Sequence, residues 1–207
     1  CRDGQVLALS TQGQLRGKWH AHVPIIASPA VTDTHVYVMT HTGTLYALDR
    51  ATMQPAWEQT LSTQPLCISS PTVARGKVYV GTQIDGLVCV GSVATARDVP
   101  TWPAPLGHPG SAGNSDNSPL PAQGSLQWQY PEDQTGESKL AMVVAPVAVI
   151  DGHVLVPLAA GHGGAKPGLV CLPARASSDQ TPAPRWRYAT THGVHLSPAA
   201  RGAEAFI

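Results

Sequence analysis

Apolar and polar residues alternate along most of this chain, in short runs with a period of two. In "THVYVMT" at residues 34–40 and "GKVYVGT" at residues 76–82, valine recurs at every second position. Turn-forming residues bound each run, with Thr-Asp-Thr or Ala-Arg-Gly before it and His-Thr-Gly or Asp-Gly after it. The pattern predicts short β-strands joined by tight turns and almost no helix.

The runs belong to a longer repeat. Residues 28–49 and 70–91 carry nearly the same 22-residue pattern, and residues 145–172 carry it again. Residues 3–19 match the back half of this unit, whereas residues 197–207 match its front half. The chain therefore contains a half unit, three whole units and another half unit.

A repeat of about 40 to 50 residues with four short strands is typical of a β-propeller blade. One blade cannot bury both faces of its sheet, so neighbouring blades stack around a common axis. We expect an all-β fold in which residues 1–207 form a single propeller domain of four-stranded antiparallel blades. The two half units could close a four-bladed ring; the ends in mid-strand favour the alternative, a fragment of a larger propeller.

One stretch departs from the repeat. Residues 100–125 contain six prolines together with many glycines and serines. This composition does not support strands, so we predict a loop insertion between the third and fourth strands of the third unit. Such a loop is either a disordered insertion or a docking surface for a partner.

The composition argues against two classes of partner. Lys plus Arg and Asp plus Glu number 13 each, which gives a formal net charge of zero and no basic field for nucleic acid. No run of about 18 apolar residues is present, so we expect no membrane insertion by this segment. The 20 glycines and 19 prolines are typical of many short strands and turns.

Four cysteines, Cys1, Cys67, Cys89 and Cys171, lack the spacing of a zinc site or a redox pair. Cys89 and Cys171 lie in matching contexts, "GLVCV" and "GLVCL", at a core position of the repeat. We interpret the cysteines as buried thiols, and a disulfide stays open as the alternative.

The repeat also resembles a known family. Its pattern is Ser-Pro-x-Val, then Gly-x-Val-Tyr-Val-Gly-Thr, then Asp-Gly-x-Leu-Tyr-Ala-Leu-Asp, then Trp. It is similar to the quinoprotein-type repeat of the pyrroloquinoline quinone (PQQ) alcohol dehydrogenases, which the outer-membrane assembly scaffold BamB shares. Residues 47–57, "ALDRATMQPAW", match the segment that runs from strand to Trp, with Met53 where Gly is usual. The resemblance covers essentially the whole chain and implies a piece of a seven- or eight-bladed propeller.

The resemblance gives an expectation for the repeated tryptophans. In the family, a Trp on the outer strand of each blade packs between adjacent blades. This resemblance implies an inter-blade role for Trp19, Trp57, Trp128 and Trp186. The family also favours an extracytoplasmic, periplasmic location, and a cytosolic setting stays open.

Three functions fit such a repeat. The one we favour is a non-catalytic scaffolding module that binds a protein partner or a small ligand on a propeller face. The second is part of a PQQ-dependent alcohol or sugar dehydrogenase, with PQQ and Ca²⁺ as cofactors. The third is the C-terminal propeller of an adenylate-forming enzyme. The sequence lacks the adjacent Cys-Cys pair of the dehydrogenases and a Cys-x-x-Cys-His haem motif, so we assign no cofactor and keep PQQ with Ca²⁺ as the alternative.

Two histidine pairs suggest metal binding. His20 and His22, in "HAH", would lie on one side of a strand, and His192 and His195 form "HGVH". A third ligand at a suitable spacing is missing in both cases. We therefore predict solvated loop histidines and no metal site.

A glycine-rich loop at residues 159–168, "AAGHGGAKPG", replaces the short turn of the other units. Loops between strands two and three share one propeller face with the loops that lead to the next blade, so we expect this loop to converge with "THGVH" at residues 191–195. If a ligand binds, we predict its site at His162, Lys166, His192 and His195. There the lysine would pair with a carboxylate or quinone oxygen; the alternative is four solvated loop residues.

Overall fold

The computed structural model describes residues 2–63, 67–74, 76–91, 124–130, 142–159, 166–174, 181–201 and 204–207. Within these ranges the chain forms sixteen β-strands and no helix, which confirms the predicted all-β fold. The part of the chain described here therefore contains no helix that is long and apolar enough to cross a membrane.

Three complete blades are four-stranded antiparallel sheets whose strand order follows the sequence. Blade two consists of β3 (Ala30–Val31), β4 (His35–Met39), β5 (Thr44–Asp49) and β6 (Pro55–Thr60). Blade three consists of β7 (Thr72–Ala74), β8 (Lys77–Gly81), β9 (Leu87–Gly91) and β10 (Ser125–Tyr130). Blade four consists of β11 (Ala148–Ile150), β12 (His153–Leu158), β13 (Gly168–Pro173) and β14 (Trp186–Ala189).

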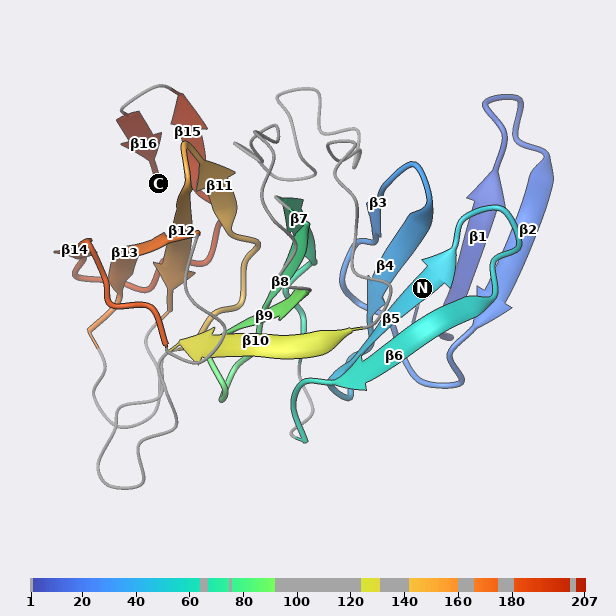
Figure 1. Cartoon of the computed structure of the whole chain (residues 1–207), viewed down its shortest axis with the longest axis horizontal. Coiled ribbons are helices and arrows are strands. Elements are labelled where there is room, and N and C mark those ends of the chain that lie inside the picture. Colours follow the sequence, from blue (N-terminus) through green and yellow to red (C-terminus); the bar gives the residue numbers. More distant parts are fainter. Residues whose placement is uncertain are drawn as a thin grey trace.

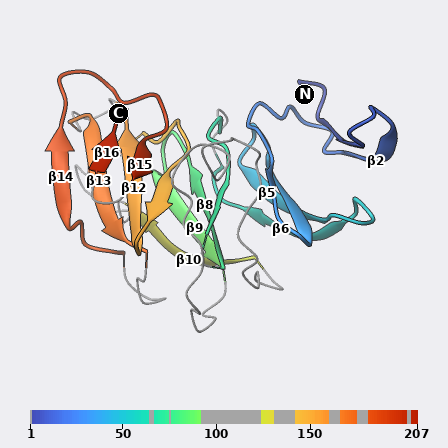
Figure 2. The ribbon, with the colours of Figure 1, turned by 90° about the horizontal axis from the view of Figure 1, so that it is seen from above.

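Two half blades flank these three. Blade one has β1 (Gln5–Leu9) and β2 (Leu15–His20), and blade five has β15 (Ala199–Arg201) and β16 (Glu204–Phe206). The half blades are separate two-stranded sheets, so they do not close a four-bladed ring. The blades instead follow one another along an arc, with β1 and β2 at one end and β15 and β16 at the other (Figure 1). The view from above shows the same separation of the two ends (Figure 2).

Turns between the second and third strands depend on glycine, as the Asp-Gly and Thr-Gly signals predict. Gly43 has a φ of 97° and Gly86 a φ of 72°, values in the left-handed region that glycine adopts at little cost. A Cβ on Gly43 would lie 2.1 Å from the carbonyl oxygen of Ser62, so the connection to the next blade also needs this position to lack a side chain.

Met53 occupies a position where the family usually has Gly, and its backbone explains that preference. Its φ of 57° lies in the left-handed region, which a Met adopts only at a cost. The side chain is buried, and Gly17 of blade one leaves room for it, because a Cβ there would come within 2.7 Å of the Met53 Cγ. Packing against blade one therefore offsets the backbone strain at Met53.

The apolar core lies between the blades. The largest buried cluster joins blades two, three and four, with Met39, Val80 and Leu158 among its members. A second cluster packs Trp19 of blade one against Leu48 of blade two. The period-two alternation of the sequence supplies these clusters, because alternate residues of each strand face the neighbouring sheet.

Polar bonds also join neighbouring blades near the inner strands. The Ser28 amide donates to the Ser70 Oγ over 2.9 Å, so the same serine of two successive repeats forms a link between blades two and three. The buried Thr72 hydroxyl donates to the Val147 carbonyl over 3.1 Å and links blade three to blade four. The repeat therefore positions polar contacts as well as apolar ones.

The predicted loop insertion at residues 100–125 lies almost entirely outside the described residues. Its flanks are described: β9 ends at Gly91 and β10 begins at Ser125, and the two strands pair with each other. The conformation of the insertion stays a prediction.

Candidate binding face

The turns between second and third strands and the connections between successive blades lie together on one face, which we call the connection face. In blade two, the His41 amide donates to the Pro24 carbonyl over 2.9 Å, and the Cys67 amide donates to the His41 carbonyl over 3.1 Å. In blade three, the Val143 amide donates to the Thr82 carbonyl over 2.9 Å. Each turn is therefore held by the connections that pass beside it.

The connection face of blade four brings together the two segments that the sequence analysis paired. The Val194 amide donates to the Leu158 carbonyl over 3.1 Å, and the Thr190 amide donates to the Pro167 carbonyl over 3.0 Å. These two bonds place the segment at residues 190–194 beside both ends of the glycine-rich loop.

Three of the four predicted ligand residues lie in these segments, and their side chains are exposed. They are Lys166, His192 and His195, whereas His162 lies outside the described residues. The Thr191 hydroxyl lies 3.1 Å from the His192 Nδ1. The backbone thus brings the segments together, and the ligand site itself stays a prediction.

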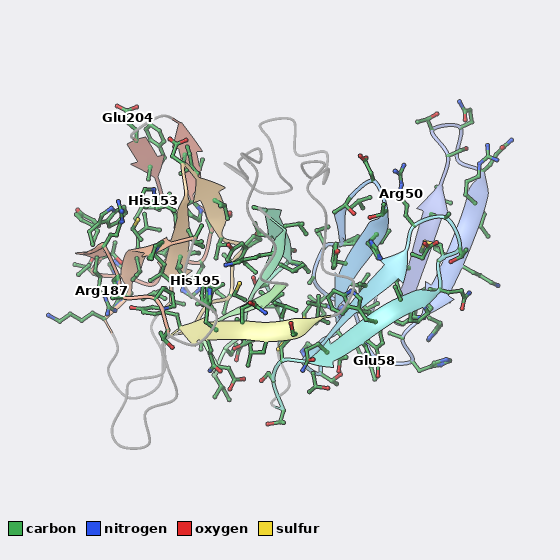
Figure 3. The ribbon with its side chains drawn as sticks, viewed as in Figure 1. Arg50, Glu58, His153, Arg187, His195 and Glu204 are labelled. Atoms are coloured by element: carbon green, nitrogen blue, oxygen red, sulfur yellow. The ribbon has the colours of Figure 1, made fainter. Side chains whose placement is uncertain are left out.

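Arg187 on β14 is a cation that the sequence analysis missed. Its Nη2 donates to the Lys166 backbone carbonyl over 2.5 Å, which places the Arg187 guanidinium beside the end of the glycine-rich loop. Arg187 also acts on Tyr130 of blade three: burial raises the pKa of that phenol, and the guanidinium opposes the increase. Figure 3 shows Arg187 on β14, and His195 in the connection that follows this strand. The sequence did contain a signal for this residue: in the strand "WRYA", adjacent residues point to opposite faces, so Arg187 points away from the face that carries Trp186.

His20 and His22 lie together for a different reason from the one expected. His20 ends β2, but His22 lies beyond the strand with a φ of 60°. The His22 amide donates to the His20 Nδ1 over 2.8 Å, and the ring centroids are 4.4 Å apart. A turn rather than strand alternation therefore pairs the two rings. Among the described residues, no group of three His, Cys, Asp or Glu side chains could hold a metal ion.

The three described cysteines are buried thiols. Burial raises the pKa of Cys67 to about 11 and the pKa of Cys89 to about 12, and it also raises the pKa of Cys171. Thiolate is the reactive form of cysteine, so these thiols are poor nucleophiles at neutral pH. Cys1 lies outside the described residues.

The four tryptophans lie on the fourth strands of their blades, but not all at the same position. Trp57, Trp128 and Trp186 pair with Ala47, Cys89 and Cys171 of the adjacent third strand. Trp19 pairs instead with Val6, two register positions away from Ala8, the residue of β1 that is equivalent to Ala47.

Two of these tryptophans contact the next blade directly. The ring centroid of Trp19 lies 4.7 Å from that of Tyr46 in blade two. Trp57 contacts blade three, because a Cβ on Gly124 would come within 2.4 Å of its ring. Their predicted role as a set stays an expectation from the family.

A cavity of about 340 Å³ lies between blade four and blade five. Its lining includes His153, Cys171, Arg185, Trp186, Glu204 and Ala205. The sequence analysis did not identify this cavity, because the repeat pattern predicts a filled junction between neighbouring blades.

PQQ with Ca²⁺ was the cofactor alternative, and the described residues do not by themselves supply a cluster of acidic ligands for Ca²⁺. Calcium requires six to eight oxygen ligands, several of them from carboxylates. The described residues contain no group of three acidic, His or Cys side chains placed for a metal ion. We therefore derive no catalytic step through a quinone.

The comparison with protein families is decisive for the identity of the repeat. A family model described as outer membrane protein assembly factor BamB matches residues 2–163, which is more than half of the chain. The chain belongs to the BamB family. No curated protein sequence matches it at a significant level.

Solved structures agree with the BamB-family fold. BamB from Moraxella catarrhalis is 18% identical, with a TM-score of 0.61 over 97% of this chain and 48% of that chain. A quinohemoprotein alcohol dehydrogenase from Comamonas testosteroni is 15% identical, with a TM-score of 0.62 over 94% of this chain and 34% of that chain. At these identities the comparisons show the propeller fold alone. This chain spans about half the length of the BamB structure and about a third of the dehydrogenase.

Proposed function

We propose that this chain is part of a non-catalytic β-propeller that binds protein partners through its connection face. The observation that carries the proposal is the match of residues 2–163 to a family described as an outer membrane protein assembly factor. An assembly factor acts by contact with other proteins, and a propeller provides a rigid support for such contacts.

The connection face has the properties of a binding surface. Backbone hydrogen bonds fix its turns against the connections between blades, as at His41 and Val194. Its loops project side chains from a rigid scaffold, which is how binding residues are commonly presented. The face can therefore bind a partner without a large rearrangement.

The chemistry of the partner follows from the charges at blade four. The Arg187 guanidinium lies beside the backbone of exposed Lys166, and exposed His192 lies in the neighbouring segment. Arg pairs with carboxylates through two parallel hydrogen bonds, and Lys adds a point charge. A partner segment that carries Asp or Glu residues suits this part of the face.

Site-specific photo-crosslinking tests the proposal. A photoreactive amino acid placed at His192 or His195 should give a discrete protein adduct in cells that naturally produce the protein. Matched controls are exposed Gln12 and Ala51, in the turns between third and fourth strands, on the face opposite the connection face. Adducts from the control positions but not from His192 or His195 would overturn the proposal.

A PQQ-dependent dehydrogenase is the second candidate, and the fold similarity to the quinohemoprotein alcohol dehydrogenase favours it. Equilibrium titration with PQQ and Ca²⁺ separates the two candidates. The scaffold proposal expects no saturable binding below millimolar concentration. Saturable binding that Lys166→Ala weakens about tenfold would instead support a quinone site at blade four.

A further inference from the structure

The turn at residues 20–22 contains a hydrogen bond that only one protonation state of histidine can form. The His22 amide donates to the His20 Nδ1 over 2.8 Å. A ring nitrogen of histidine accepts a hydrogen bond only when it carries no proton, so the His20 ring in this turn is neutral and holds its proton on Nε2. The bond therefore selects both the charge and the tautomer of the His20 ring.

The same bond supports a backbone conformation that His22 does not adopt readily. The φ of His22 is 60°, in the left-handed region, where a residue other than glycine is uncommon. In an Asx-turn, an Asn or Asp side chain accepts the backbone amide two residues further on, and the His20 ring takes that role here. Loss of this bond removes an interaction that offsets the cost of the His22 conformation.

The two imidazole rings also lie against each other. Their centroids are 4.4 Å apart and their planes are inclined by 34°. Two neutral rings pack at this distance, whereas two imidazolium ions so close together repel each other. Protonation thus acts on the turn in two ways: a proton on the His20 Nδ1 removes the acceptor, and a further charge on His22 drives the rings apart.

The turn lies between two fixed points of the connection from blade one to blade two. Before it, the Ala21 amide donates to the Gly4 carbonyl over 3.0 Å. After it, the His41 amide donates to the Pro24 carbonyl over 2.9 Å. Both bonds join backbone groups, which do not change charge near neutral pH. An opening of the turn therefore stays local, because the connection remains attached to both blades.

Charged residues of both signs lie on the elements beside the two rings. Gln5 of β1 pairs with His20, and the Gln5 amide donates to the Asp3 Oδ1 over 3.2 Å. Lys18 of β2 lies on the same side of the strand as His20, since alternate residues share a face. A carboxylate favours a positive charge on the rings, and an ammonium group opposes it. The charged and titratable residues on these neighbouring elements are Arg2, Asp3, Lys18 and His41.

We propose that residues 20–22 form a pH-sensitive turn on the connection face, which is closed when His20 is neutral and opens when His20 is protonated. Histidine is the side chain that changes charge between about pH 5 and pH 8, so acidification within that range opens the turn. The closed turn presents two neutral rings, and the open turn presents separated, positively charged rings. The proposal concerns this turn alone and holds whether or not the connection face binds a protein.

Nuclear magnetic resonance of the 207-residue protein, labelled with nitrogen-15, gives the first test. At about pH 8 the His20 ring should be the Nε2–H tautomer. The protection factor of the His22 amide against solvent exchange should fall at least about tenfold between about pH 8 and about pH 5, with the same midpoint as the titration of the His20 ring. An Nδ1–H tautomer at His20, or a protection factor that does not change with pH, would overturn the proposal.

Two substitutions of His20 separate loss of the acceptor from other effects of acid. In His20→Asn the side-chain carbonyl can accept the His22 amide as in an Asx-turn, and it does not titrate. We expect the protection factor of the His22 amide in this variant to be nearly the same at about pH 8 and about pH 5. His20→Ala supplies no acceptor and should lack the protection at both pH values. A fall on acidification in His20→Asn as large as in the unmodified protein would contradict the proposal, since another group would then open the turn.

His35→Asn is the matched control on the opposite face of blade two. The Nδ1 of His35 also has a local partner, but that partner is the Thr34 hydroxyl, 2.9 Å away, which can rotate to donate or to accept. This substitution should leave the pH dependence at the His22 amide unchanged. The Ala21 and His41 amides serve as internal controls, because their backbone bonds should persist at both pH values. Loss of protection at these two amides together with His22 would show that the whole connection detaches, and the proposal of a local turn would be wrong.

Discussion

Trp128 in blade three and Trp186 in blade four have similar local sequences and different surroundings. They begin "WQY" and "WRY", and each pairs with a cysteine of the adjacent third strand. Trp128 is 4% exposed, whereas Trp186 is 44% exposed. The local sequence and the strand register are therefore not what buries a tryptophan in this fold.

The difference comes from the next blade along the arc. Trp128 belongs to the large cluster that includes Val147 and Val149 of blade four. Trp186 faces blade five, of which the described residues form the first two strands, and it borders the open cavity. In a repeat fold, each unit obtains much of its stability from the surface that its neighbour covers.

Truncation of the two tryptophans should show this difference most strongly. Trp128→Ala should lower the free energy of unfolding by about 3–5 kcal/mol, because it removes a buried aromatic side chain from a closed junction. Trp186→Ala should cost about 1 kcal/mol or less, as is usual for a partly exposed site. Urea denaturation of the two variants measures both losses. Similar losses for the two variants would show that the junctions do not differ in packing.

The sequence predicted the blades well because their determinants are local. Alternating valines, Asp-Gly or Thr-Gly turns and Ser-Pro starts each specify a strand or turn within a few residues, and the repeat confirms the assignments several times over. Even the glycine preference at Met53 has a local cause in its left-handed backbone.

Features that depend on two elements could not be read from the sequence. The β1–β2 turn closes with a bond from the Ser10 amide to the Gln14 carbonyl. This turn is one residue shorter than the equivalent turn of blade two, which closes with a bond from the Asp49 amide to the Gln54 carbonyl. Trp19 also lies two register positions beyond the position that Trp57 occupies in blade two. The recurrence of Trp in the sequence does not reveal this shift. The cavity beside Trp186 depends on which strands of blade five lie next to it. A repeat pattern predicts only a junction in which neighbouring blades pack without a cavity.

The next largest difference between the two blades should lie in how the free energy of unfolding depends on alkaline pH, through the cysteines that pair with these tryptophans. Burial raises the pKa of Cys89 to about 12, so its thiol stays protonated in the folded state when the unfolded thiol ionises. The stabilisation is complete below the ordinary pKa near 9 and is lost as the pH rises toward 12. We expect the free energy of unfolding to fall by up to about 1.4 kcal/mol per pH unit for this thiol.

Replacement by the residue that blade two has at this position provides the measurement. Cys89→Ala, which copies Ala47 of blade two, should flatten the decline in unfolding free energy between pH 9 and about pH 10.5. Cys171→Ala should flatten it as well, but by less, because Cys171 borders the open cavity. Urea titrations at a series of pH values compare the slopes. A slope unchanged by Cys89→Ala would show that this thiol ionises in the folded protein as easily as in the unfolded chain.

The smallest expected difference concerns the residues that begin the second strands of the two blades. Lys77 reaches from blade three to blade four, where its Nζ donates to the Ala174 carbonyl over 3.2 Å. His153 begins β12 at the equivalent position, but it lines the cavity beside blade five. Lys77→Met should therefore cost about 1 kcal/mol, the usual net value of one hydrogen bond, since Met keeps much of the aliphatic packing. His153→Met should change the free energy of unfolding by less than about 0.5 kcal/mol. A larger loss at His153 than at Lys77 would mean that the junction of blades four and five is packed as closely as the junction of blades three and four.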